Sequence, residues 1–266
     1  MQINWARARL AAEAADLAYT EGRALAAGAR RAGLAVRDIL DDAGTGANAC
    51  LLTGEGLAFL AVRGTEKDFR DILTDLDVRK RQLTHDDFTF RGRIHAGFQR
   101  QALAIMASPL GVAAARLQDE GCPVIACGHS LGGAVALLAS IRLGLDEVYS
   151  FGAPRVGDKA FAAETAGRRQ HFRFTRAADI VPHLPLLGLG YRHDAPALYF
   201  GGGGRFLGNA PLWRQWASLA WRSVTGAWMK GPITGIPIPA TPFADHRVSG
   251  YVDAVERETL YQGVVA

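Results

Sequence analysis

The stretch Cys127-Gly128-His129-Ser130-Leu131-Gly132-Gly133 decides the fold of this chain. An apolar run at residues 123–127 precedes it, and small, helix-favouring residues follow it up to Leu143. This pattern predicts a strand, a sharp turn at Ser130 and a helix. In such a turn the serine hydroxyl stands clear of the sheet, and the flanking glycines let strand and helix pass closely. The backbone N–H of Leu131 is then aimed at the place where an oxyanion would form.

The composition is that of one globular core. The chain has 266 residues, of which 49% are apolar and 21% are charged, and we expect a single domain over residues 1–266. The formal net charge is +4, without the dense basic patches that nucleic-acid binding needs. The cysteines Cys50, Cys122 and Cys127 lack C-x-x-C spacing, so neither a disulfide framework nor a metal site is expected.

The N-terminal residues 1–29 alternate apolar and charged side chains. They contain no continuous apolar stretch, so no signal peptide is visible. No run reaches the roughly 18 apolar residues of a membrane span. On these grounds we expect a cytoplasmic protein, with export by a signal-independent route left open because such a route leaves no mark of this kind.

Strand-like and helix-like segments alternate along the chain. Apolar spacing predicts a helix from Trp5 to Ala29 and a long helical stretch from about 93 to 120, interrupted near Pro109. Strands are predicted at residues 49–53, 57–62, 123–127, 147–151 and 171–175. Such alternation predicts an α/β fold with a mostly parallel central sheet and helices on both faces.

An acid is expected after the serine. A serine hydroxyl becomes a good nucleophile only when a base takes its proton, and the base needs a carboxylate that fixes its tautomer. Around a turn of this type the chain order is serine, acid, histidine. Asp179 directly follows a predicted strand and precedes Ile180-Val181-Pro182, so it is the predicted acid. The competing carboxylates are Asp158, which is typical of a helix N-cap, Asp194, which lies in a strand-like run, Asp245 and Asp253.

The predicted base is His246. It is the last histidine of the chain and stands on a loop before a C-terminal helix, from which an imidazole can reach the serine. His171 lies within a predicted strand. His183 and His193 also follow Asp179 and remain alternatives, although both stand in proline or strand context, where a polar packing role is more usual.

Several motifs beyond the serine turn occur in a recognisable order. With them, the chain resembles the fungal-type (class 3) lipase family of α/β-hydrolases from about Cys50 to Tyr251. The motifs that carry the resemblance are Val62-Arg63-Gly64-Thr65, Asp71-Ile72-Leu73-Thr74-Asp75-Leu76, His95-Ala96-Gly97-Phe98, the Gly128–Gly133 turn, Phe151-Gly152-Ala153-Pro154-Arg155-Val156-Gly157, Asp179-Ile180-Val181-Pro182-His183-Leu184-Pro185 and His246-Arg247-Val248-Ser249-Gly250-Tyr251.

The resemblance implies roles for particular residues. Ser130, Asp179 and His246 match the family's catalytic triad, and Thr65 matches the residue that completes the oxyanion hole with Leu131. Residues 66–76 match the position of a mobile amphipathic lid, and a helix fixed on the core is an equal alternative. His95 and Arg155 belong to matching motifs, and we expect both to tie loops together. His129 either touches substrate or packs.

The implied activity is that of a serine carboxylic-ester hydrolase, a lipase or esterase acting on acylglycerol-type esters without a metal or organic cofactor. A phospholipase A1 acting at membranes is the nearest alternative, because the same triad would cleave a glycerophospholipid. A non-catalytic binding module on the same scaffold is a third, and an intact serine, acid and histidine argue against it. The implied partner is a lipid or ester substrate, with transient contact to a lipid interface.

Residues 201–243 depart from the family pattern. This insertion contains four of the five tryptophans, Trp213, Trp216, Trp221 and Trp228, and no acidic residue occurs from Ala195 to Ala244. One hypothesis is an interfacial helix that lies on a lipid surface, since tryptophan and basic residues suit the headgroup region. The alternative is an insertion packed over the acyl groove, which would bury the indoles against the domain.

Overall fold

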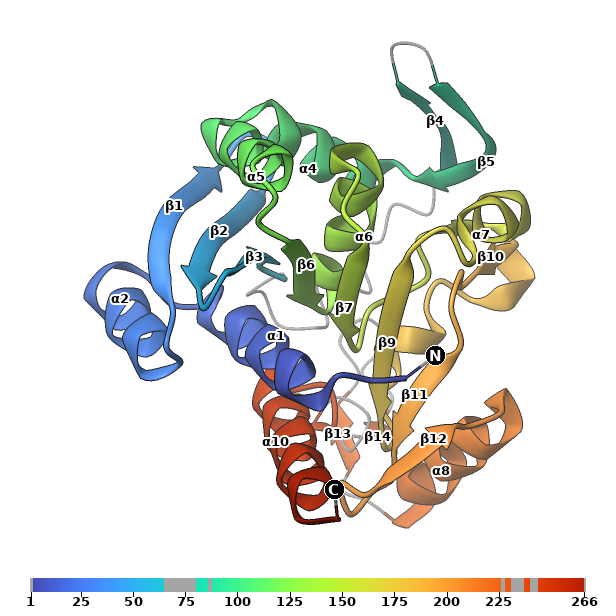
Figure 1. The fold of residues 1–266 in the computed structure, drawn as a ribbon. Helices are drawn as coiled ribbons and strands as arrows, with labels where there is room; N and C mark the ends of the chain where they lie inside the picture. Colours follow the sequence, from blue (N-terminus) through green and yellow to red (C-terminus); the bar gives the residue numbers. More distant parts are fainter. Residues whose placement is uncertain are drawn as a thin grey trace.

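The computed structural model describes residues 2–64, 80–85, 88–225, 228–230, 237–239 and 244–265. Within this part of the chain the centre of the molecule is an eight-stranded sheet, whose members lie side by side in the order β1-β2-β3-β6-β7-β9-β11-β12 (Figure 1). Their bounds are β1 (Ala35–Asp42), β2 (Ala47–Gly54), β3 (Leu57–Val62), β6 (Val124–His129), β7 (Glu147–Phe151), β9 (Gln170–Arg176), β11 (Ala197–Phe200) and β12 (Phe206–Asn209).

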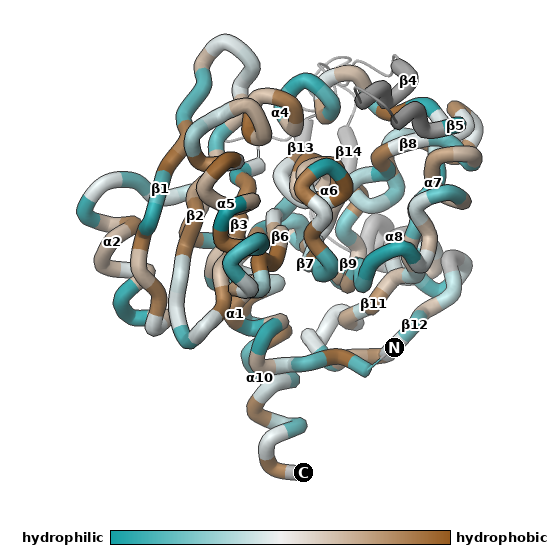
Figure 2. Tube along the Cα trace, turned by 45° about the horizontal axis from the view of Figure 1, so that its top comes forward, coloured by the Kyte–Doolittle hydropathy of each residue, from teal (hydrophilic) through white to brown (hydrophobic). Residues whose placement is uncertain are grey.

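The middle of this sheet is parallel and its edges are antiparallel. β3, β6, β7, β9 and β11 run parallel to one another, whereas β1, β2 and β12 are joined to them by antiparallel pairings. The central strands are buried on both faces and therefore read as nearly continuous apolar runs, coloured mostly brown in β3 and β6 in Figure 2.

Helices cover both faces. The helices of the described residues are α1 (Trp5–Leu17), α2 (Gly22–Arg31), α4 (Ala96–Ala107), α5 (Pro109–Asp119), α6 (Leu131–Leu143), α7 (Lys159–Thr165), α8 (Leu212–Thr225) and α10 (Val248–Val265), with two short 3-10 turns, η1 (Val181–His183) and η2 (Leu187–Leu189). Apolar residues of α4, α5 and α6 pack on one face, and those of α1, α2 and α10 pack on the other. The predicted α/β fold, with a mostly parallel sheet between helices, is confirmed.

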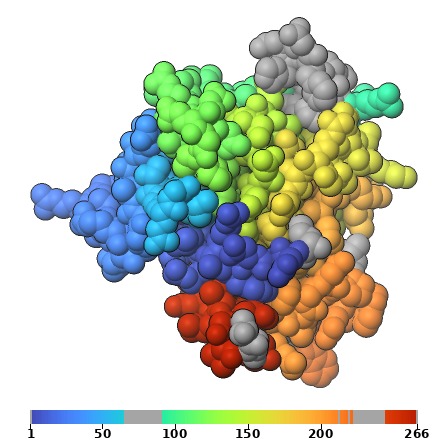
Figure 3. Space-filling view, viewed as in Figure 1, coloured from blue at the N-terminus to red at the C-terminus, as the bar shows by residue number. Residues whose placement is uncertain are grey.

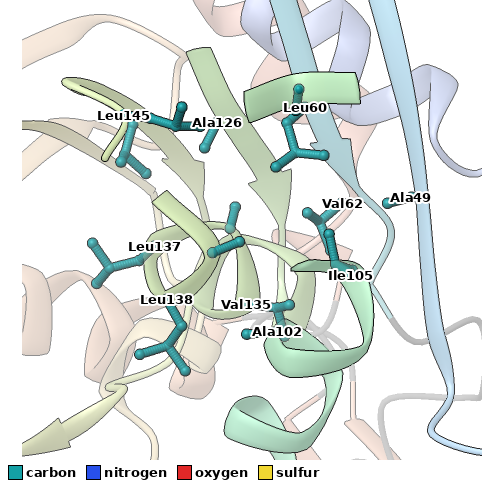
Figure 4. Packing of buried hydrophobic residues seen from close by; sticks show 14 of the residues in the cluster. Ala49, Leu60, Val62, Ala102, Ile105, Ala126, Val135, Leu137, Leu138 and Leu145 are labelled. Atoms are coloured by element: carbon teal, nitrogen blue, oxygen red, sulfur yellow. The ribbon is translucent and has the colours of Figure 1, made fainter. Parts of the chain in front are cut away.

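The packing is dense around α6. Figure 4 shows Val135 of α6 close to Ala102 of α4, and Val62 of β3 close to Ile105 of α4, and all four are buried. Each such apolar side chain stabilises the folded state by about 1.5–3 kcal/mol when fully buried. Because α6 follows Ser130 directly, this contact holds the start of the helix rigidly against the end of β6.

Two small sheets complete the described structure. One contains β10 (Tyr191–Arg192), β8 (Gly157–Asp158), β5 (Phe88–His95) and β4 (Lys80–His85), and the other pairs β13 (Trp228–Lys230) with β14 (Pro237–Pro239). No helix in the described part of the chain is both long and apolar enough to span a bilayer.

The structure differs from the sequence expectation at the N-terminus. The helix predicted from Trp5 to Ala29 is two helices, α1 and α2, separated at residues 18–21. The hydroxyl of Thr20 donates to the carbonyl of Leu17 at 2.8 Å, a local bond that competes with continuation of the helix. The break turns the chain so that Tyr19 reaches the end of β6, where it contacts His129. The predicted interruption near Pro109 is confirmed by the boundary between α4 and α5.

Candidate active site

Ser130 occupies a strained turn between β6 and α6. Its φ of 57° and ψ of −133° lie in a region that non-glycine residues rarely adopt. Two glycines permit the turn: a Cβ on Gly132 would lie 2.2 Å from the carbonyl oxygen of Val62, and one on Gly128 would lie 2.5 Å from the backbone of Gly132. Neither distance can be accommodated by a real side chain, so strand, turn and helix approach closely only with glycine at both positions.

The side chains of Ser130, His246 and Asp179 lie in one line of hydrogen bonds. His246 Nε2 lies 2.8 Å from Ser130 Oγ, and His246 Nδ1 lies 2.8 Å from Asp179 Oδ2. All three residues are at most 8% exposed. A carboxylate only accepts, so Nδ1 carries the imidazole proton and Nε2 is left to accept from the serine hydroxyl. This is the tautomer that a serine nucleophile requires.

The carboxylate of Asp179 is held by two further donors. The backbone N–H of Val181 donates to Oδ1 at 2.9 Å, and the hydroxyl of Tyr251, on α10, donates to Oδ2 at 2.6 Å. Burial and the neighbouring carboxylate raise the pKa of Tyr251 well above its usual value, so the hydroxyl remains a donor. These two hydrogen bonds therefore fix the orientation of the Asp179 carboxylate.

Asp245 connects the loops that carry the acid and the imidazole. Its Oδ2 accepts the backbone N–H of Ala178 at 3.1 Å, and its own carbonyl accepts Arg176 Nη1 at 3.2 Å. Asp245 is thus hydrogen-bonded to both Arg176 and Ala178, at the end of β9 and in the turn after it. Asp245, one of the competing acids in the sequence, therefore has a structural role: it connects the loop of His246 to the loop of Asp179.

His129 links the serine turn to the backbone of His246. Its Nε2 lies 2.6 Å from the carbonyl oxygen of His246, and its Nδ1 lies 2.9 Å from the hydroxyl of Tyr19. The hydroxyl oxygen of Tyr19 in turn interacts with the backbone N–H of Gly64, the last described residue before Thr65. Burial, and then the nearby His246, lower the pKa of His129 well below its usual value, so the ring stays neutral. Both ring nitrogens of His129 are thus used to connect the loop of His246 with Tyr19.

The described part of the chain contains one of the two expected oxyanion donors. Leu131 begins α6, and the first N–H groups of a helix have no partner within it. The Leu131 N–H therefore stands at the positive end of the helix dipole, directly after Ser130. Thr65 and the expected lid at residues 66–76 lie outside the described residues.

The alternative histidines lie elsewhere in the fold. His193 Nε2 hydrogen-bonds to the carbonyl of Pro182 at 2.7 Å. The ring of His183 lies 4.7 Å from the ring of Trp216, and burial together with Arg155 lowers the pKa of His183 to about 4. Among the contacts of the described residues, it is the imidazole of His246 that meets Ser130.

A second serine, histidine and aspartate lie in a row between the sheet and the loop before β11. Ser150 Oγ lies 2.8 Å from His171 Nε2, and His171 Nδ1 lies 3.0 Å from Asp194 Oδ1. The bonding pattern repeats that of Ser130, but Ser150 stands within β7 in ordinary strand backbone and is 0% exposed. A substrate carbonyl has no path to this hydroxyl, so the row satisfies buried polar groups between β7, β9 and the loop before β11.

His95 and Arg155 are structural, as expected. His95 caps α4, with its Nδ1 accepting the backbone N–H of Gly97 at 3.1 Å. Arg155 is buried, and its Nη1 donates to the carbonyls of His183 and Pro185 in the loop that follows Asp179. Burial, with a contribution from Arg192, lowers the pKa of Arg155 to about 10, which still leaves the guanidinium charged at neutral pH.

Comparison with known proteins identifies relatives. The family described as "Lipase (class 3)" matches residues 59–189. Secreted mono- and diacylglycerol lipase 1 of Fusarium solani is 36% identical over 116 residues, which cover 41% of this chain and 35% of that protein. Secreted mono- and diacylglycerol lipase A of Penicillium cyclopium is 40% identical over 84 residues, covering 30% of this chain and 28% of that protein. The matched region thus spans about a third of the length of these relatives.

The fold has solved counterparts. The crystal structure of a mutant form of the Penicillium cyclopium protein MDLA superposes with a TM-score of 0.63 over 94% of this chain and 96% of that chain. The two sequences are 20% identical, so this superposition shows the shared α/β-hydrolase fold and nothing more.

The expected cytoplasmic location is contradicted, because both relatives are named as secreted lipases. The expectation rested on the pattern of residues 1–29, and the structure gives that pattern another cause. Residues 5–17 form α1, in which Ala8, Ala11 and Ala15 are fully buried against the sheet. The N-terminal pattern therefore records packing and carries no information on location.

The family match covers the centre of the chain, from β3 past the turn at Ser130 to the loop after Asp179. The two relatives in sequence are named as lipases, which is consistent with the family match, and the solved structure has the same fold. Residues 59–189, about half of the chain, thus match the class 3 lipase family.

Proposed function

We propose that this chain is a serine carboxylic-ester hydrolase that cleaves acylglycerol-type esters through an acyl-enzyme intermediate. One observation carries the proposal: the imidazole of His246 bridges Ser130 Oγ and the Asp179 carboxylate at 2.8 Å on each side. The names of the relatives, mono- and diacylglycerol lipases, support the substrate class.

In the acylation step, Ser130 Oγ attacks the acyl carbonyl carbon while His246 Nε2 takes the hydroxyl proton. The carbonyl oxygen becomes an oxyanion, which we assign to the N–H of Leu131 and, by family likeness, to Thr65. Removal of one such donor costs about 3 kcal/mol of transition-state stabilisation. Asp179 stabilises the imidazolium that forms and holds its tautomer. His246 then returns the proton to the departing alcohol oxygen, and the acyl group remains on Ser130.

Deacylation repeats these steps with water as the nucleophile. His246 Nε2 takes a proton from water, the hydroxide attacks the acyl carbon, and the ester bond to Ser130 breaks. The proton passes to Ser130 Oγ and the free carboxylic acid departs. Neither half of the cycle requires a group beyond those of the chain and water.

We also propose that residues 1–266 form a single domain with residues 201–243 as an insertion. The single sheet from β1 to β12 and the packing of α1 against α10 support this proposal, since they join the two ends of the chain.

Turnover of p-nitrophenyl esters of increasing acyl length, alongside mono-, di- and triacylglycerols and a diacyl phospholipid, tests the proposal. We expect hydrolysis of the long-chain esters and acylglycerols by the native protein, with release of one fatty acid per ester bond cleaved, and none by Ser130→Ala. Cleavage of the phospholipid in preference to every acylglycerol would reassign the substrate class. Absence of ester hydrolysis in the native protein would refute the proposal.

A further inference from the structure

The helix α8 carries its indoles on the outside. Trp213 and Trp221 are each 70% exposed and Trp216 is 40% exposed. Among the side chains of α8 that the structure describes, the buried one is polar: Gln215 is 3% exposed, and its Nε2 donates to the carbonyl of Ala210 at 2.8 Å. A surface helix of a globular domain normally buries its apolar side and exposes its polar side. The alternative in which the insertion buries its indoles is therefore wrong for Trp213 and Trp221.

The three tryptophans share one side of the helix. Positions 213, 216, 217, 220 and 221 follow the spacing of three and four residues that aligns side chains along a helix. Between the indoles this side carries Ala217 and Ala220, so its large side chains are Trp213, Trp216 and Trp221, which we call the indole face. Exposed large apolar side chains are common singly, but three indoles together mark an interaction surface.

The segment of sequence that contains the indole face carries charge of one sign. From Ala195 to Ala244 the chain has four basic residues, Arg205, Arg214, Arg222 and Lys230, and no acidic residue. The whole chain has 30 basic and 26 acidic residues. This segment therefore holds the entire formal net charge of +4, and the remainder of the chain is balanced. Arg214 itself is exposed on α8.

The indole face lies next to the candidate active site. The ring of Trp216 lies 4.7 Å from the ring of His183, which belongs to η1, the turn directly after Asp179 and Ile180. In the ribbon, α8 lies at the edge of the molecule beside β12, and Figure 3 shows the orange residues of this region at the lower right of the surface (Figures 1 and 3). A surface that docks here would lie beside the loop that holds the acid of the triad.

We propose that the indole face docks on an anionic lipid surface and so holds the active site beside its ester substrate; this partner assignment rests on the proposed function. Indoles suit the boundary between acyl chains and headgroups because the ring is apolar and its N–H is a donor. Basic residues without acidic neighbours are attracted to anionic headgroups, each by roughly fivefold in partition coefficient. A second copy of the chain would bring the same positive segments together, which disfavours self-association through this face.

Vesicle binding tests the proposal without catalysis. The Ser130→Ala protein, which leaves the lipid intact, is sedimented with vesicles of phosphatidylcholine and with vesicles that also contain phosphatidylglycerol. We expect stronger partition onto the phosphatidylglycerol vesicles and a loss of that preference at high salt. Brominated phosphatidylcholine in the same vesicles should quench the tryptophan emission, a readout that needs no substitution in α8.

Two variants, both made in the Ser130→Ala background, test the indole face. One combines Trp213→Ser with Trp221→Ser, and the other carries Arg214→Gln. The double substitution should lower partition onto both kinds of vesicle at least tenfold, since two indoles no longer enter the lipid. Arg214→Gln should lower partition only onto the anionic vesicles. Ile39→Ser is the matched control: Ile39 is 52% exposed on β1, at the opposite edge of the sheet from β12, and its removal should change nothing.

Native-like partition by the double variant, with unquenched emission in the parent protein, would overturn the proposal. Self-association that disappears in the double variant, measured by light scattering, would assign the face to a second copy and overturn it as well. The assay separates the docking surface from the proposed function. Binding without hydrolysis in the native protein refutes the function alone, and hydrolysis of soluble esters without binding refutes the docking alone.

Discussion

His129 Nε2 lies 2.6 Å from the carbonyl oxygen of His246, across 117 residues of sequence. A carbonyl only accepts, so Nε2 carries the proton and Nδ1 accepts the hydroxyl proton of Tyr19 at 2.9 Å. The residue before Ser130 therefore holds the backbone of the imidazole that meets Ser130. Any shift of β6 against the loop of His246 would change the distance between nucleophile and base.

We predict that His129→Leu lowers kcat by tenfold to a hundredfold with little change in KM. The substitution leaves a buried carbonyl without its donor, at a cost of about 1–3 kcal/mol. His129→Gln can place an amide N–H near the position of Nε2 and should recover most of the rate. The measurement is kcat and KM on a soluble short-chain ester, with a thermal midpoint for each variant. Equal kcat in folded His129→Leu and native protein would show that the bond has no effect on the position of His246.

Tyr19→Phe tests the other side of the same ring. The variant removes the hydroxyl that meets His129 Nδ1 and interacts with Gly64, so both a buried acceptor and a backbone donor lose a partner. We expect a loss of about 1–2 kcal/mol in unfolding free energy and a several-fold lower kcat. Urea unfolding followed by fluorescence, together with ester turnover, measures both. An unchanged midpoint and rate would contradict the importance of this link.

Tyr251→Phe removes one of the donors to Asp179. The bond between the Tyr251 hydroxyl and Asp179 Oδ2 is 2.6 Å long and fully buried, and hydrogen bonds to charged groups contribute about 1.5–3 kcal/mol. We predict a lower unfolding free energy of that size and a reduced kcat, because the carboxylate gains freedom to rotate away from His246 Nδ1. Tyr199→Phe is a control, since its hydroxyl donates to the carbonyl of Ala177 at 2.9 Å and does not touch the carboxylate. Equal kcat losses in the two variants would argue against a specific role of Tyr251.

Stability should fall as the solution becomes acidic. Burial is the largest cause that lowers the pKa of His129, His183 and His193, to about 4 for His183. The folded state keeps these rings neutral, whereas the unfolded chain binds their protons below about pH 6.5. Their contribution is therefore complete above pH ~6.5 and is lost as the pH falls towards about 4, by up to ~1.4 kcal/mol per pH unit for each ring.

Urea unfolding at a series of pH values measures this slope. His193→Gln keeps a donor for the carbonyl of Pro182 and removes one titrating ring. The unfolding free energy of this variant should therefore fall less steeply with decreasing pH, by up to the contribution of one ring. A free energy of unfolding that stays constant from pH ~6.5 to pH ~4.5 would contradict the prediction.

The central fold was predictable because its signals are local. The apolar run of β6, the glycines around Ser130 and the small residues of α6 each express the close approach of strand and helix, so the sequence marks the turn directly. The strand β1 was missed because its residues alternate between half-buried and exposed and include four charged side chains, which resembles a turn-rich surface segment.

The support around Ser130 was less predictable because it is non-local. Tyr19 is one example, because only the break after α1 brings its hydroxyl to His129. Tyr251 belongs to the motif that begins at His246 and lies five residues after it, in the first turn of α10. This closeness to His246 was the only signal in the sequence that Tyr251 could contact Asp179. A pattern of residue types carries no record of which buried donor meets which acceptor.

The row of Ser150, His171 and Asp194 offers an internal control for the proposed chemistry. Ser130→Ala should lower kcat by at least a thousandfold, because the nucleophile is lost. Ser150→Ala should keep kcat within about threefold of the native value and lose about 1 kcal/mol of stability, since one buried hydrogen bond disappears. A large rate loss in Ser150→Ala at full folding would mean that the buried row takes part in the reaction.

The most direct test is the site of covalent labelling by a fluorophosphonate probe, read by mass spectrometry of the digested protein. The reagent reacts with a serine only when a base activates the hydroxyl. We predict a single adduct on the peptide that contains Ser130, absent in Ser130→Ala and strongly reduced in His246→Ala. An adduct on Ser150, or no adduct on the folded native protein, would contradict the assignment of Ser130 as the nucleophile.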